Sequence, residues 1–129
     1  NPEGEWRTGL VGAMAGVAAF DEASDAWVDA ERAALGHNRV LLGDLLAEQL
    51  PLAVYRAPDA GYLAWIDVSA YGWGDDPAVL LRTAAKVALH HGPQFGPQGI
   101  GFVRLNFGCS PELLTEAVAR IGAVARAGS

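Results

Sequence analysis

The sequence predicts an α+β fold, an α/β sandwich in which helices cover a small sheet of three to four strands. Three observations predict this fold. Apolar residues recur at helical spacing over residues 25–50, and they alternate with polar residues at strand spacing over residues 102–107. Two pairs, Asp76-Pro77 and Ser110-Pro111, have the form of a helix cap followed by proline at the first helical position. Helices and strands of this kind in one short chain favour helices packed on a sheet.

The size and charge of the chain exclude several classes of protein. Its 129 residues are enough for one domain with its own core, and 9 Lys and Arg against 15 Asp and Glu give a net charge of −6. An acidic chain without a basic stripe argues against nucleic acid as a partner. No apolar run approaches the ~20 residues that cross a bilayer, and one cysteine excludes an internal disulfide framework. We therefore expect a cytoplasmic globular protein that binds neither nucleic acid nor membrane. Because the chain begins at Asn1-Pro2 without Met, we expect a piece of a longer protein.

Three of the predicted helices have clear periodicity. The first follows an apolar stripe from Trp6 to Phe20. The second is a long amphipathic helix from Asp25 to Leu50, with Ser24 as its N-cap and Pro51 as its stop. The closing helix begins at the Ser110 cap and continues an apolar stripe almost to the end of the chain. We expect all three stripes to face other elements.

The middle of the chain predicts shorter elements. Residues 61–68 have the composition of a strand with both faces largely buried. A helix opens at Asp76-Pro77 and runs through Val87, and its Lys86 is expected to extend its side chain to solvent. Leu89 and His90 suggest a short strand, whereas residues 92–101 are too rich in Gly and Pro for regular structure.

The strand at 102–107 carries the strongest indication of a binding site. Its odd-numbered members, Val103, Leu105 and Phe107, form an apolar face that belongs against helices. Arg104 and Asn106 then project from the opposite face, side by side. A guanidinium presents a planar fork of donors that matches a carboxylate, and a strand holds it rigidly. The alternative interpretation is a solvated sheet face with a surface arginine.

Other candidate residues support weaker hypotheses. The Gly-rich run at 96–101 leads into a strand and lacks a following Lys, which argues against a phosphate loop. His90 and His91 point to opposite faces of an extended segment, and His37 has no partner four residues on, so a zinc site is not expected. Cys109 lies near a helix N-terminus, where a thiol could act as a nucleophile. A small residue packed at a strand-to-helix junction explains Cys109 better.

Two stretches of the sequence follow the pattern of a known family. The first is Gly61-Tyr62-Leu63-Ala64-Trp65-Ile66-Asp67, and the second runs from Val87 through Phe95-Gly96, Gly99 and Gly101 to Arg104-Leu105-Asn106-Phe107. On these residues, and on Trp27 and Asn38-Arg39 upstream, the chain resembles the C-terminal small domain of pyridoxal phosphate (PLP) enzymes of the class I/II aminotransferase superfamily. Within that superfamily it is similar to the cystathionine β-lyase-like C–S lyase branch.

The resemblance implies a division of the chain and a role for one residue. Residues 1–23 would be a remnant helix of the large PLP-binding domain, and residues 24–129 would be the small domain, with the aminotransferase small-domain fold. Arg104 would bind the α-carboxylate of an amino acid substrate. The lysine that binds PLP would lie in the missing large domain, and Lys86 does not match it. No catalytic, cofactor-binding or metal-binding residue is therefore expected in this chain.

The function implied by the resemblance is that of a substrate-clamping domain of a PLP-dependent C–S β-lyase that acts on amino acids. PLP would be the cofactor of the longer parent enzyme, which would be a homodimer, whereas this fragment would bind no cofactor and be inactive alone. Two alternatives stay open: a domain of a PLP-dependent aminotransferase, or a freestanding module that binds a small carboxylate through Arg104. An interaction domain without a ligand is a third.

Overall fold

The structure is a computed structural model that describes residues 9–128. The chain divides into two compact units, residues 1–34 and 35–129. The first unit holds helix α2 (Leu10–Ala19), the 3-10 turn η1 (Glu22–Ser24) and the start of helix α3 (Asp25–Gln49). The predicted first turn of the N-terminal helix, with Trp6, lies outside the described residues.

Helix α2 is apolar and has no buried residue. Its helical state over residues 10–19 agrees with the prediction, and within its own unit its apolar positions are exposed. The large exposed side chains are Leu10, Val11, Met14, Val17 and, just after the helix, Phe20.

The long predicted helix is confirmed as α3, and only its cap differs. The Ser24 hydroxyl donates to the carbonyl of Ala18 at 2.8 Å, so it does not accept a hydrogen bond as an N-cap. The carboxylate of Asp21 instead accepts the N–H of Ala23 at 2.9 Å and caps the turn η1, which leads into α3. Among residues 9–128, every helix is too short or too polar to span a bilayer.

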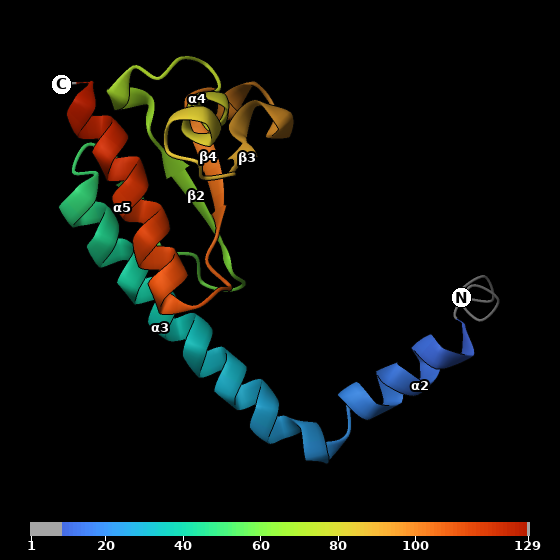
Figure 1. Cartoon of the computed structure of the whole chain (residues 1–129). Helices are drawn as coiled ribbons and strands as arrows, with labels where there is room; N and C mark the ends of the chain where they lie inside the picture. The colour runs from blue at the N-terminus through green and yellow to red at the C-terminus, as the bar shows by residue number, and fades with distance from the viewer. Residues whose placement is uncertain (1–8, 129) are drawn as a thin grey trace. The chain divides into compact units, whose positions relative to one another are not determined.

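The second unit contains a four-stranded antiparallel sheet, which confirms the predicted α+β class (Figure 1). The strands lie in the order β1 (Val54–Tyr55), β2 (Leu63–Asp67), β4 (Phe102–Asn106) and β3 (His90–His91). β1 was not predicted, because two residues are too few to show a strand periodicity. The prediction that residues 61–68 bury both faces is wrong, because only Ala64 and Ile66 within β2 are buried.

One face of the sheet packs against three helices and forms the core. These helices are α3, α4 (Pro77–Ala84) and α5 (Pro111–Ala127). Where α3 ends, Gly122 of α5 lies so close that an added Cβ would be 3.0 Å from the Gln49 Cβ. The core side chains are Leu42, Leu46, Leu50, Ala64, Ile66, Val68, Ala78, Leu81, Ala85, Val103, Leu105, Phe107, Leu114, Val118, Ile121 and Ala125. The predicted apolar stripe of α5 and the later part of that of α3 are thus confirmed, whereas Trp27 near the start of α3 is exposed.

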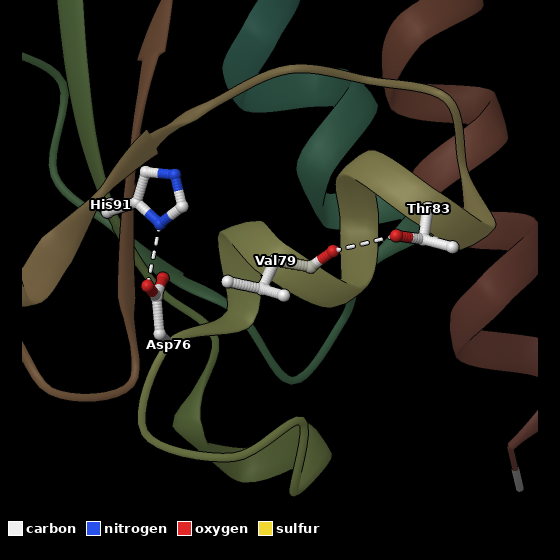
Figure 2. Close-up of polar contacts among 4 residues, drawn as sticks. All are labelled: Asp76, Val79, Thr83 and His91. Carbon is white, nitrogen blue, oxygen red and sulfur yellow. Dashed lines mark hydrogen bonds and ion pairs between the residues drawn. The ribbon is translucent and has the colours of Figure 1, made fainter.

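Helix α4 begins where predicted, but its cap is not the one expected. Pro77 is the first helical residue, and the Asp76 side chain makes no capping hydrogen bond. The Asp76 carboxylate instead contacts Nδ1 of His91 at 2.6 Å, as Figure 2 shows, and so joins the start of α4 to the edge strand β3. Within the helix, the Thr83 hydroxyl donates to the carbonyl of Val79 at 3.3 Å.

Helix α4 also ends earlier than predicted. Its last residue is Ala84, and Lys86 follows with a positive φ of 57°. A left-handed residue stops an α-helix, and here no glycine marks the stop in the sequence. The prediction that Lys86 lies within the helix is therefore wrong, although its side chain is exposed.

Two polar groups fix the exit of β4 and the start of α5. The Ser110 hydroxyl accepts the N–H of Leu113 at 3.3 Å, which confirms the predicted cap. The amide of Asn38, 3% exposed on α3, donates to the carbonyls of Phe107 at 2.9 Å and Cys109 at 2.7 Å. The strand that carries Arg104 is thereby joined to the long helix at its end.

Candidate functional site

The face of the sheet away from the helices carries a row of larger side chains at the centre of the sheet. We call this the open face, and its residues from β2, β4 and β3 are Leu63, Trp65, Asp67, Phe102, Arg104, Asn106 and His90. None of them is buried, in contrast to Val103 and Leu105 on the other face. The register places Trp65 and His90 directly opposite Arg104 on its two neighbouring strands. The predicted projection of Arg104 away from the core is therefore confirmed.

A shaped loop between β3 and β4 packs its aromatic side chain against this row. It consists of two 3-10 turns, η3 (Gly92–Phe95) and η4 (Pro97–Gly99). The turns approach so closely that a Cβ on Gly92 would lie 2.1 Å from the carbonyl oxygen of Gly99. Only glycine fits there, which explains the composition of the segment. The loop shape brings Phe95 over the open face.

The guanidinium of Arg104 lies against an aromatic cluster. Its Cζ is 4.4 Å from the ring centroid of Phe95, within the range of a cation–π contact. Phe95 meets Trp65 edge to face at 5.5 Å, and Trp65 stacks on Phe102 at 5.4 Å. We call Trp65, Phe95 and Phe102 the aromatic cluster. It restricts the arginine side chain, which would otherwise be free to change rotamers.

Arg104 retains an unmet hydrogen-bonding group. Its Nε–H is buried and has no hydrogen-bond partner among the described residues, and no acidic side chain there forms an ion pair with it. A buried donor without an acceptor is costly, so such a site favours an external acceptor. A carboxylate is the acceptor that a guanidinium edge matches best, because it can take two parallel N–H bonds.

Two other side chains of the open face accept hydrogen bonds within local turns. The Asp67 carboxylate accepts the N–H of Ser69 at 2.9 Å. The side chain of Asn106 accepts the N–H of Gly108 at 2.8 Å and so shapes the chain beyond β4. Asn106 thus has a structural task through its Oδ1, and Arg104 is the permanently cationic group of the open face with unused donor capacity.

The remaining residues considered from the sequence lie elsewhere. Lys86 and Cys109 line a cavity of about 340 Å³ on the helix side of the sheet, together with Leu105, Leu114 and others. Burial raises the pKa of the Cys109 thiol, the opposite of what a nucleophile needs. Among residues 9–128, no three His, Cys, Asp or Glu side chains are grouped as a metal site.

The described residues also do not fit a PLP site. Lys86, the only lysine of the chain, lies on the helix side of the sheet, whereas Arg104 lies on the open face. The three rings of the aromatic cluster contact one another and Arg104, and they do not surround a space for a cofactor ring.

The strand pattern of the sequence singles out Arg104 but not Phe95, which the structure places against it. One feature of the sequence could have indicated Phe95. It is an aromatic residue within a Gly- and Pro-rich loop, where neither a strand nor a helix periodicity explains an apolar side chain. Trp65 contacts both Phe95 and Phe102, so its ring covers part of the open face.

Comparison with known proteins finds relatives among cystathionine beta-lyases. A cystathionine beta-lyase of Corynebacterium glutamicum is 36% identical over 118 residues, which cover 89% of this chain and 30% of that protein. The cystathionine beta-lyase PatB of Bacillus subtilis is 43% identical over 79 residues, or 60% of this chain and 20% of that protein. The chain spans about three tenths of the length of the first curated relatives. No family model matches the chain.

Solved structures agree with these relatives. The PLP-bound C–S lyase of Staphylococcus hominis superposes with a TM-score of 0.78 at 28% identity, over 84% of this chain and 29% of that one. Cystalysin of Treponema denticola, at 22% identity, shares the fold with a TM-score of 0.83 over 92% of this chain and 30% of that one. In sequence the chain is thus similar to cystathionine beta-lyases, and in fold it is similar to PLP-dependent C–S lyases and aminotransferases, of which it matches a C-terminal part.

Proposed function

We propose that this chain is the substrate-clamping domain of a PLP-dependent C–S β-lyase and that Arg104 binds the α-carboxylate of the amino acid substrate. One observation carries the proposal: a half-buried guanidinium on the open face, packed on Phe95, has a buried Nε–H with no partner. A substrate carboxylate at the accessible edge of this guanidinium would accept its remaining N–H groups and neutralise the charge at the same time. The relatives named as cystathionine beta-lyases and the C–S lyase neighbour support the lyase class.

The role of Arg104 in this proposal is to orient the substrate. Two parallel hydrogen bonds to a carboxylate fix both its position and its plane, and so they restrict the bonds around the adjacent Cα. Residues 1–23 would belong to a large domain that holds PLP, and residues 24–129 would form the small domain. The parent would be a homodimer with its catalytic residues outside this chain, so the chain alone would be inactive.

The test replaces Arg104 in the complete gene product that carries this chain. We expect Arg104→Ala to lower kcat/KM for a cysteine thioether by roughly 30- to 1,000-fold, mostly through KM, because a charge-assisted bidentate contact contributes about 2–4 kcal/mol. The visible absorbance of bound PLP should stay unchanged. Arg82→Ala is the matched control, since Arg82 is an exposed arginine on α4.

A second measurement isolates the carboxylate itself. The corresponding amine, which lacks the carboxylate, should bind wild type and Arg104→Ala with the same affinity. Normal affinity of Arg104→Ala for the amino acid would refute the assignment. Product analysis separates lyase from aminotransferase, because elimination releases a thiol, ammonia and a keto acid, whereas transamination needs an amino acceptor and releases no thiol.

A further inference from the structure

We propose that Phe95 is a positioning residue for substrate binding, which holds the Arg104 guanidinium by its face and leaves its N–H edge free for the carboxylate. This inference rests on the proposed function of Arg104. The donors of a guanidinium lie in its plane, so a ring stacked on the face does not compete with a carboxylate at the edge. The Cζ of Arg104 lies over the Phe95 ring, 4.4 Å from its centroid, so the ring contacts the guanidinium without supplying a conventional hydrogen-bond acceptor to its N–H groups.

The exposure of Phe95 indicates that its role is not core packing. Its side chain is 41% exposed, and it lies on a loop outside the helix-covered core. A phenylalanine that buries so little of its surface contributes less to stability than a core residue does. Its ring nevertheless contacts both Arg104 and Trp65.

The ring of Phe95 is itself held in place from two sides. On the sheet, the Trp65 ring meets the Phe95 ring edge to face at an interplanar angle of 88°. The Phe102 ring in turn stacks on the Trp65 ring. In the loop, the side-chain amide of Gln98 donates to the carbonyl of Phe95 at 2.9 Å. The contacts therefore run from two strands through the aromatic cluster to the guanidinium.

The expected consequence is a smaller population of the binding-competent arginine rotamer when the ring is removed. β4 fixes the Cα of Arg104, but the long side chain still has several rotatable bonds. The apparent dissociation constant rises by the inverse of the competent fraction. From the usual strength of a partly desolvated cation–π contact, we expect the KM of Phe95→Leu to rise roughly 3- to 30-fold with kcat nearly unchanged.

The experiment uses the complete, PLP-loaded gene product and three substitutions at this position. Phe95→Leu and Phe95→Met remove the ring and differ in how they fill its volume, so either one gives a result if the other fails to fold. Phe95→Tyr keeps the ring and should restore a KM close to that of wild type. Ile100→Ala is the matched control, since Ile100 is a half-exposed apolar residue of the same loop without a ring contact.

A double mutant separates this proposal from the one on which it rests. In the Arg104→Ala background, Phe95→Leu should have no further effect on KM, because no guanidinium is left to position. If Arg104→Ala raises KM but Phe95→Leu and Phe95→Met do not, the role of Phe95 is refuted while that of Arg104 stands. If the two substitutions add in full, Phe95 acts independently of Arg104 and the proposal also fails. If Arg104→Ala itself leaves KM unchanged, the proposed function fails first.

Discussion

Asn38 is the side chain whose removal should most clearly loosen the strand that carries Arg104. It lies on α3, is 3% exposed, and donates to two carbonyls just after β4, those of Phe107 and Cys109. Asn38→Ala would leave both oxygens without this donor in a buried region. A buried polar group that loses its partner costs about 1–3 kcal/mol. The Oδ1 of Asn38 is itself buried without a partner, so its removal returns part of that cost.

We therefore expect Asn38→Ala to lower the free energy of unfolding by about 2–4 kcal/mol. For a domain of this size the melting temperature should fall by roughly 10–25 °C. Urea unfolding followed by circular dichroism measures the change, and His37→Ala is the control because His37 is the adjacent, exposed residue on α3. The reasoning is wrong if Asn38→Ala costs less than about 0.5 kcal/mol, the usual range for a surface substitution such as His37→Ala.

Two further predictions concern the loop and the thiol. Gly92→Ala should destabilise the protein by more than about 2 kcal/mol, because its Cβ would lie 2.1 Å from a backbone oxygen of Gly99. Gly36 lies in the middle of α3 with free space where a Cβ would be, so Gly36→Ala should instead stabilise the protein by up to about 1 kcal/mol. Equal urea midpoints for Gly92→Ala and Gly36→Ala would contradict both predictions. Burial raises the pKa of Cys109, so less thiolate exists at pH 8 and iodoacetamide should alkylate it more slowly in the folded chain than in urea. Because the pKa of Cys109 is higher in the folded chain than in the unfolded chain, the contribution of the thiol to the free energy of unfolding falls as the pH rises above the unfolded pKa. Equal alkylation rates in the folded chain and in urea would refute the raised pKa.

The long and strongly periodic elements could be predicted from the sequence. α3, β4 and α5 each place apolar residues at a spacing that only one secondary structure satisfies, and the core uses those residues. β1 could not be predicted, because its two residues owe their strand state to pairing with Asp67 and Ile66 of β2. A partner in a neighbouring strand is not visible in a local window.

The caps show the same limit in another form. Ser110 caps its own helix, so the local pattern was sufficient. Asp76 stands before a proline in the same way, but His91, 15 residues further on, takes its carboxylate. The end of α4 at Lys86 was missed because a lysine there adopts the left-handed conformation that a sequence normally marks with glycine.

The candidate site divides into a part that the sequence specifies and a part that the loop specifies. Alternation in β4 determines that Arg104 leaves the sheet on the face opposite Val103 and Leu105, because burial of those two residues fixes the strand. It does not determine the direction of the guanidinium, which depends on Phe95 and hence on the shape of residues 92–99. Substitutions in the core of β4 should therefore change stability first, whereas substitutions in the loop should change carboxylate affinity at nearly constant stability. On the proposed function, the strand would supply the position of the binding group and the loop its orientation, so that the affinity for a carboxylate would change without any change of the arginine.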